Sequence, residues 1–169
     1  METMNIPLDV IKKLRELSGA GIMHCKKALV EAQGDIEKAH EILQQQSALI
    51  IEKKSNRAVT QGLIETYIHT GGRIGAILEV NCETDFVART DEFKTLAHEL
   101  AMQIAALAPQ FISEDDIKPE TRGENQSCLL SQPYIRDPNK TVQNIINETI
   151  AKVGENIKVR RFVRFELGE

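Results

Sequence analysis

The chain has 169 residues, of which 41% are hydrophobic and 27% are charged, a composition typical of one or two small globular domains. Its formal net charge is −4, so no overall positive field attracts nucleic acid or an anionic membrane surface. Three widely spaced cysteines indicate free thiols in a reducing compartment rather than a secreted disulfide framework. No apolar run approaches the ~20 residues of a membrane helix, and the first ten residues have the character of neither a signal nor a transit peptide. We therefore expect a protein that is neither secreted nor membrane-bound.

Three short helices are predicted in residues 1–45. Pro7 suits a first helical position, Gly34 suits the end of the second helix because glycine tolerates the left-handed conformation, and Asp35 is the predicted N-cap of the third. The apolar side chains expected to pack together are Ile11, Leu14 and Leu17, then Cys25, Ala28, Leu29 and Ala32, then Ile36, Ala39, Ile42 and Leu43. The first domain is therefore a compact three-helix module with a small core.

A domain boundary is predicted in residues 46–58, which are polar apart from "ALII". The pattern fits a linker and an extension of the third helix equally well, and both readings stay open. Residues 59–169 form the second domain.

The second domain begins with a predicted β-hairpin, because "GLIETYIH" and "RIGAILEVNC" are β-rich runs joined by the glycine turn "TGG". Ile74, Ala76, Leu78 and Val80 alternate onto one face of the second strand, which predicts a sheet with one buried side. Thr90 is the predicted N-cap of an amphipathic helix through residue 107 that lies across this sheet.

Residues 109–137 contain three prolines with acidic and polar residues between them, so we expect a long loop with at most a brief turn. Thr141 is then expected to cap a last helix that ends at Gly154, and residues 156–167 to form a strand that pairs with the hairpin. The predicted fold class is α+β, with a three-helix module followed by an antiparallel three-stranded sheet packed with helices.

The segment "TDFVAR", residues 84–89, lies between the second strand and the long helix and contains an aromatic residue in a chain that has few. In one interpretation Phe86 and Val87 tuck under the sheet while Asp85 caps the turn. In the other, the strand and helix hold a short loop outward and aim Phe86 at a partner, since aromatic residues often anchor interfaces. The pattern alone favours neither.

No catalytic set is evident, and we expect no enzyme, no cofactor and no metal site. The four histidines have no conspicuous nucleophile partner, and His69 and Cys82 lack the closely spaced ligand pairs of a zinc site. The last strand interleaves three arginines with two phenylalanines, as an RNA-stacking platform does. A basic edge strand with core aromatics explains the same pattern and is the preferred interpretation. The residues concerned are Arg160, Arg161, Phe162, Arg164 and Phe165.

The sequence resembles the elongation factor Ts family over most of its length. The resemblance rests on "LRELSGAGIMHCKKALVEAQGDIEKA", "HTGGRIGAILEVNCETDFVART", "LLSQPYIRDPNKTV" and "GENIKVRRFVRFELG", four separated segments in the family's order. It implies a ubiquitin-associated-like N-terminal module and a guanine-nucleotide exchange factor for elongation factor Tu, with no covalent chemistry. No direct contact with nucleic acid or a membrane is implied.

The resemblance also implies which residues bind the partner. Ile22 and Met23 match the apolar pair in the "GAG" loop of the N-terminal module, which docks on the partner's G domain. Thr84, Asp85, Phe86 and Val87 match the exchange motif, whose loop presses on partner helices beside the nucleotide and magnesium site.

The region between Ala108 and Leu129 is shorter here than the family's usual helical excursion, which puts contacts of that excursion in doubt. Other compact members act as homodimers, so a homodimer is one option here. The expected location is the plastid stroma if the protein is plastid-encoded and the bacterial cytoplasm otherwise. Two alternative functions remain, a ubiquitin-like-binding module and an RNA-binding accessory protein.

Overall fold

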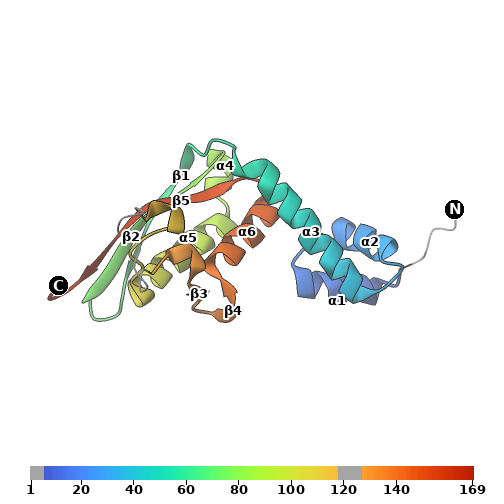
Figure 1. Ribbon diagram of the computed structural model, residues 1–169, viewed down its shortest axis with the longest axis horizontal. Helices are drawn as coiled ribbons and strands as arrows, with labels where there is room; N and C mark the ends of the chain where they lie inside the picture. The colour runs from blue at the N-terminus through green and yellow to red at the C-terminus, as the bar shows by residue number, and fades with distance from the viewer. Residues whose placement is uncertain (1–5, 118–126) are drawn as a thin grey trace. The chain divides into compact units, whose positions relative to one another are not determined.

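The computed structural model describes residues 6–117 and 127–169 and forms two compact units, which divide between Asn56 and Arg57. Helices precede a three-stranded antiparallel sheet in the chain, so the α+β prediction is confirmed. Figure 1 shows the order of the elements. The two units are described separately below.

The N-terminal unit consists of α1 (Leu8–Ser18), α2 (Ile22–Glu31) and α3 (Ile36–Ser55). Its small core matches most of the predicted positions and consists of Ile6, Ile11, Leu14, Cys25, Ala28, Leu29, Ala32, Ala39 and Leu43. Leu17 was expected in this core and is instead exposed. It lies in the last turn of α1, just before Gly19 ends the helix in a left-handed conformation.

The connection from α2 to α3 is longer than the sequence predicts. Helix α2 ends at Glu31, because both Gln33 and Gly34 have positive φ angles of 55° and 87°. The Asp35 side chain then caps α3 by accepting hydrogen bonds from the Glu37 and Lys38 amides at 3.0 and 3.2 Å. Residues 46–55, for which a linker and a helix were both open, continue α3.

The second unit is built on a sheet of β1 (Gln61–Ile68), β2 (Ile74–Cys82) and β5 (Ile157–Glu166), with β2 in the centre. Both neighbours run antiparallel to β2, and the ladder with β5 shifts register by one residue between Glu79 and Val80. Alternate β2 side chains are buried on one face, as predicted, namely Ala76, Leu78, Val80 and Cys82.

Helix α5 (Asp91–Leu107) covers that buried face and contacts all three strands, as Figure 1 shows within this unit. Thr90 is its N-cap, as predicted, and its hydroxyl accepts from the Phe93 amide at 3.3 Å. Helix α6 (Val142–Val153) packs against α5. It begins after Thr141 and ends at Gly154, whose φ of 77° is the left-handed conformation that glycine tolerates.

The prediction of a loop over residues 109–137 is wrong for much of the part that the structure describes. That part contains the short helices η1 (Glu114–Asp116) and η3 (Leu129–Ser131) and the first strand of a second sheet, β3 (Pro133–Tyr134) with β4 (Asp137–Thr141). The buried side chain of Gln103, on α5, holds this region. Its Nε2 donates to Pro133 O at 3.0 Å, and its Oε1 accepts from the Ile135 backbone amide at 3.0 Å. The remainder of the predicted loop, residues 118–126, lies outside the described residues.

The face of the sheet opposite α5 carries apolar side chains from all three strands. Across the ladder, Ile77 lies beside Val163, and Gly75 lies between Ile68 and Phe165. The exposed side chains that form this open sheet face are Ile64, Ile68, Ile77, Val163 and Phe165. The expectation that both aromatics of β5 fill the core is therefore wrong for Phe165, which is 64% exposed.

Candidate functional site

The segment between β2 and α5 is a single helical turn, α4 (Asp85–Ala88), rather than the loop expected from the sequence. Thr84 is its N-cap, and the Thr84 hydroxyl accepts a hydrogen bond from the Val87 amide at 3.4 Å. The expectation that Asp85 caps the turn is wrong. Asp85 is the first residue of the turn, where the helix dipole favours a carboxylate, and it forms a 2.8 Å ion pair with Arg89.

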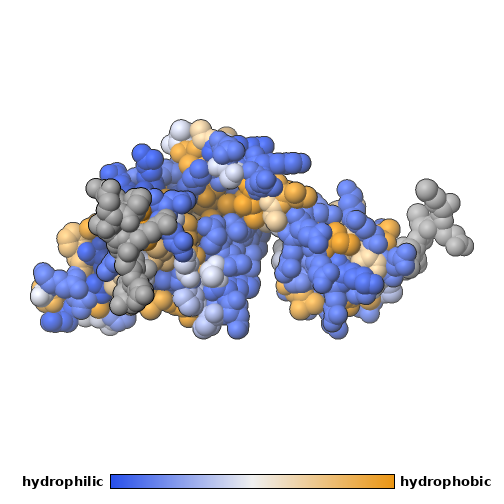
Figure 2. All heavy atoms as spheres, in the orientation of Figure 1, coloured by the Kyte–Doolittle hydropathy of each residue, from blue (hydrophilic) through white to orange (hydrophobic). Residues whose placement is uncertain are grey.

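Phe86 and Val87, neighbours on α4, differ sharply in exposure. The Phe86 side chain is 78% exposed, whereas Val87 is 9% exposed and Ala88 is buried beside it. Helix α4 contacts β1, β2 and α5, which are the elements that receive its buried side. Figure 2 shows apolar atoms at the surface near α4. The interpretation that both side chains are buried therefore holds for Val87 and is wrong for Phe86, and the contact of Phe86 with a partner stays a prediction.

Several hydrogen bonds from outside the turn hold α4 in place. The Thr84 amide and hydroxyl donate to the two carboxylate oxygens of Glu155 at 2.9 and 2.7 Å. The Asn156 amide in turn donates to Glu83 at 2.8 Å. At the other end, the Thr90 hydroxyl donates to Val87 O at 2.8 Å. Phe86 is thus an exposed aromatic ring on a firmly anchored backbone.

The Cys82 thiol, which lies beneath this turn, is protonated and unreactive. Cys82 is fully buried at the end of β2, and its Sγ donates to Thr84 O at 3.1 Å. Burial, with a smaller effect from the charge of Glu155, raises the pKa of the Cys82 thiol to about 11. A protonated thiol is a hydrogen-bond donor and a poor nucleophile, so Cys82 supports the turn and does no chemistry.

Ile22 and Met23 are the first two residues of α2 rather than part of the preceding loop. Gly21 precedes them as the N-cap, and its carbonyl accepts from the Cys25 amide at 3.0 Å. Although both lie on a well-formed helix, Ile22 is 53% exposed and Met23 is 63% exposed. Two large apolar side chains are therefore presented to solvent at a fixed helix start.

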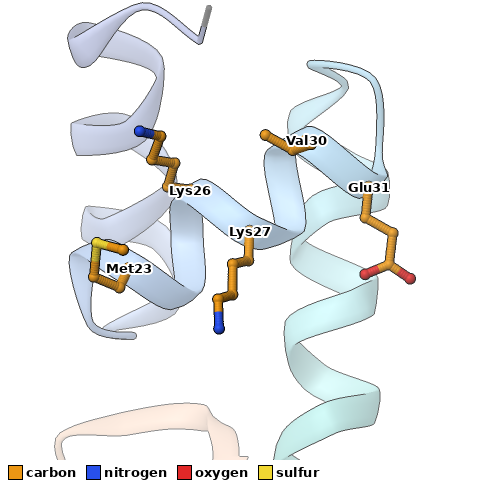
Figure 3. A pocket seen from close by; sticks show the side chains of 5 residues that line it. All are labelled: Met23, Lys26, Lys27, Val30 and Glu31. Atoms are coloured by element: carbon orange, nitrogen blue, oxygen red, sulfur yellow. The ribbon is translucent and has the colours of Figure 1, made fainter. Parts of the chain in front are cut away.

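Met23 also borders an open hollow along α2. Its lining residues are Met23, Lys26, Lys27, Val30 and Glu31, and Figure 3 shows that they all come from α2. Residues three, four and seven positions apart share one face of a helix, so two lysines lie between the apolar Met23 and Val30. A helix of a partner with apolar and acidic side chains would complement this face.

Two of the three arginines of β5, Arg161 and Arg164, are paired within the protein. Arg161 Nε donates to Glu79 at 2.8 Å, which lowers the pKa of that carboxyl group. Arg164 reaches over the other face of the sheet, where its Nε donates to Ala105 O at 3.1 Å and its NH2 group pairs with Glu166 at 2.6 Å. Phe162 and Phe165 lie on opposite faces, so they cannot form one stacking row.

Other chemistry has little support in the part of the chain that is described. Residues 6–117 and 127–169 contain no group of three or more His, Cys, Asp or Glu side chains placed to hold a metal ion. His69 contacts the Tyr67 hydroxyl at 3.2 Å, and His98 lies 3.4 Å from Glu65. No helix in the same residues has the length and apolar character needed to span a membrane.

Glu155 and Glu83 are functional candidates that sequence reasoning missed. Each lies at the end of an element, where no periodicity marks a buried contact, and each meets its partner more than 70 positions away. The motif letters around Glu155 belong to the "GENIKVRRFVRFELG" segment, but only the fold brings that segment to Thr84.

Comparison with known proteins identifies the family that the chain resembles. A family model described as Elongation factor TS matches residues 10–127 and 122–169. An elongation factor Ts of Thermotoga neapolitana is 49% identical over 195 aligned positions, which cover 98% of this chain and 99% of that protein. The elongation factor Ts of Thermoanaerobacter pseudethanolicus is 48% identical, covering 97% and 96%. That of Carboxydothermus hydrogenoformans is 46% identical, covering 97% and 90%.

These alignments extend over more positions than the 169 residues of the chain, so the relatives carry residues that it lacks. The two parts of the family match meet at residues 122–127, inside the region that the sequence predicts to be shortened. All three organisms are bacteria, and these relatives give no support to the plastid location.

Proposed function

The chain belongs to the elongation factor Ts family, and from this membership we propose that it is a guanine-nucleotide exchange factor for elongation factor Tu. It binds elongation factor Tu that carries GDP, speeds the release of GDP and so allows GTP to load during protein synthesis. The reaction forms and breaks no covalent bond, and the protein is not an enzyme.

The observation that carries this proposal is the exposure of Phe86 on an anchored turn. A large apolar side chain that is 78% exposed gains nothing from folding, whereas it gains hydrophobic free energy when a partner covers it. The burial of Val87 and the hydrogen bonds between Thr84 and Glu155 hold the Phe86 ring in place when it contacts the partner. Phe86 is therefore the residue that presses on elongation factor Tu, and Thr84, Asp85 and Val87 hold it there.

Thermodynamic linkage explains how such a contact releases nucleotide. A factor that binds the partner more tightly without GDP than with it must weaken GDP binding by the same ratio, because both ligands share one coupling free energy. A coupling of about 1–3 kcal/mol corresponds to an affinity change of about 5- to 150-fold. The Phe86 contact supplies this preference if the ring fits only the conformation of elongation factor Tu in which the nucleotide site is disturbed.

The N-terminal unit has a different role in this proposal. Ile22 and Met23 are exposed apolar residues beside the lysines of α2, which suits a docking surface for the G domain of elongation factor Tu. Docking supplies affinity and concentrates the second unit near its target. Residues 57–169 then carry out the exchange step.

The open sheet face supports a second interaction, with another copy of this chain. Five exposed apolar side chains from three adjacent strands make a patch of the kind that marks protein interfaces. A two-fold dimer buries one patch with its copy, since such interfaces are self-complementary. We propose that this face forms a homodimer, and that the protein acts in the bacterial cytoplasm.

The alternative functions have weaker support. An RNA-stacking platform on β5 conflicts with the intramolecular pairing of Arg161 and Arg164 and with the separation of Phe162 and Phe165. A ubiquitin-like-binding module would involve the N-terminal unit alone, whereas the family match extends through the second unit.

The test is the release of fluorescently labelled GDP from purified elongation factor Tu, measured by stopped flow with excess unlabelled nucleotide. The proposal predicts that the release rate rises with the concentration of this protein and then saturates. If the rate stayed at its spontaneous value at all concentrations, the exchange function would be rejected.

A further inference from the structure

We propose that Glu155 is a positioning residue for exchange, which acts through Thr84 to fix the place and direction of Phe86. The inference rests on the proposed function, since it concerns the same contact with the partner. It adds a residue from a distant part of the chain, the corner between α6 and β5, which the exchange motif itself does not include.

The contact is bidentate and charge-assisted. One Glu155 carboxylate oxygen accepts from the Thr84 amide at 2.9 Å, and the other accepts from the Thr84 hydroxyl at 2.7 Å. Hydrogen bonds to an ionised group are stronger than neutral ones, and two parallel bonds fix orientation as well as distance. Thr84 is thus held in one rotamer and one backbone position.

The hydroxyl of Thr84 transmits this position to α4. A hydroxyl has a single proton, and at Thr84 that proton is donated to Glu155. Only its lone pairs remain, and one of them accepts from the Val87 amide as the N-cap of α4. Glu155 therefore orients the very group that begins the turn carrying Phe86.

A single helical turn needs such support from outside. Starting a helix orders several residues for one hydrogen bond, so an isolated turn of four residues is unstable in water. Burial of Val87 and Ala88 holds one side of α4, but burial alone does not direct the exposed side. The carboxylate of Glu155 supplies the fixed direction at the N-terminal end.

The corner that carries Glu155 is itself held to the end of β2. Asn156 donates its amide to Glu83 at 2.8 Å and its side chain to Arg57 O at 3.0 Å. The two segments are thus joined reciprocally. The Glu155 carboxylate accepts from Thr84, and the Glu83 carboxylate accepts from the Asn156 amide. This arrangement makes Glu155 a rigid support, because its own backbone cannot drift away from Thr84.

The experiment measures GDP release from elongation factor Tu at increasing concentrations of the Glu155→Ala and Glu155→Gln variants. We expect Glu155→Ala to lower the release rate at saturation by about 10-fold, since small misplacements of a working group are costly. The concentration for half-saturation should change less than 2-fold, because docking through the N-terminal unit is untouched. Glu155→Gln should recover part of the rate, since its amide oxygen still accepts one of the two bonds.

Glu99→Gln is the matched control for general loss of stability. Like Glu155, Glu99 accepts a hydrogen bond from a hydroxyl group, that of Tyr134, at 2.5 Å. Glu99 in addition pairs with Arg136 at 3.1 Å, and it does not touch α4. If Glu99→Gln slowed exchange as much as Glu155→Ala at equal thermal stability, the effect would be a general one and the positioning role would be rejected.

A double-mutant cycle shows whether Glu155 acts through Phe86. In a Phe86→Ala background, Glu155→Ala should cause no further loss, whereas independent effects would multiply. The proposed function fails if the unchanged protein does not stimulate release. The positioning role alone fails if the unchanged protein is active and Glu155→Ala remains fully active, or if the two losses multiply.

A reporter at position 86 provides a readout without elongation factor Tu. The chain has no tryptophan and two tyrosines, so Phe86→Trp introduces a single tryptophan, which can be excited selectively at wavelengths that tyrosine does not absorb. Adding Glu155→Ala should increase the fast local motion in its anisotropy decay, and adding Glu99→Gln should not. Equal local motion in the presence and absence of the Glu155 carboxylate would contradict the proposal.

Discussion

Phe86 is 78% exposed and its neighbour Val87 is 9% exposed, so two adjacent apolar residues of one helical turn face solvent and core respectively. The difference separates two roles within one motif. Val87 contributes to the stability of the second unit, and Phe86 contributes to the contact with a partner. Substitutions at the two positions should therefore have different consequences.

Val87→Ala should lower the free energy of unfolding. The GDP release rate of the protein that remains folded should change less. Removing two buried methyl groups costs about 1–3 kcal/mol in unfolding free energy, because transfer and cavity terms add. Urea unfolding followed by circular dichroism measures this loss. An unchanged midpoint would contradict the burial of Val87, and Leu167→Ala, at a position that is 64% exposed and outside the open sheet face, is a control that should cost less.

Met23→Glu should weaken docking and leave the maximal exchange rate nearly unchanged. A charge in place of an exposed apolar anchor costs about 1–2 kcal/mol of binding, which raises the concentration for half-saturation about 10-fold. Titrated GDP release measures both quantities.

Leu8→Glu is the control for Met23→Glu, since Leu8 is an exposed apolar residue of α1 outside the hollow along α2. It should leave the half-saturating concentration unchanged. A fall in the maximal rate with Met23→Glu, at unchanged half-saturation, would assign Met23 to the exchange step instead of docking.

Phe165→Glu should convert a dimer into monomers if the open sheet face is the interface between copies. A carboxylate placed within a buried apolar patch would lose its hydration without gaining a partner. Light scattering coupled to size-exclusion chromatography gives the mass of each form. A monomeric unchanged protein at high concentration, or a Phe165→Glu variant that stays dimeric, would overturn this assignment.

The three thiols should react slowly in the folded protein at pH 8. Cys25, Cys82 and Cys128 are all buried, and burial raises the pKa of both Cys82 and Cys128, the former to about 11. At pH 8 these two thiols therefore stay protonated, and thiolate, the reactive form, is scarce. Absorbance with a disulfide reagent should rise rapidly only after denaturant is added, and rapid reaction of one thiol in native buffer would contradict the packing.

Local signals in the sequence were sufficient for most helices and for the main sheet. Thr90, Thr141 and Gly154 mark helix ends through side-chain and backbone chemistry that acts within a few residues. The alternation along β2 likewise reports its buried face directly. These elements could be predicted because their determinants are close together in the chain.

Contacts between distant residues could not be predicted in the same way. The β3–β4 hairpin has few apolar residues, and the buried Gln103 that holds its start is a polar residue on an apolar helix face. Phe165 alternates like a core residue, but its face of the sheet is open in this chain. Glu155 has no local signal at all, since its role depends on a fold that places it beside Thr84.

The most direct test of the account is GDP release from elongation factor Tu with Phe86→Ala. Because Phe86 is exposed, the substitution should change unfolding free energy by less than about 0.5 kcal/mol. It should nevertheless lower the saturating release rate about 10-fold or more, since an interface anchor is lost. A Phe86→Ala variant that is stable and releases GDP as fast as the unchanged protein would contradict the account.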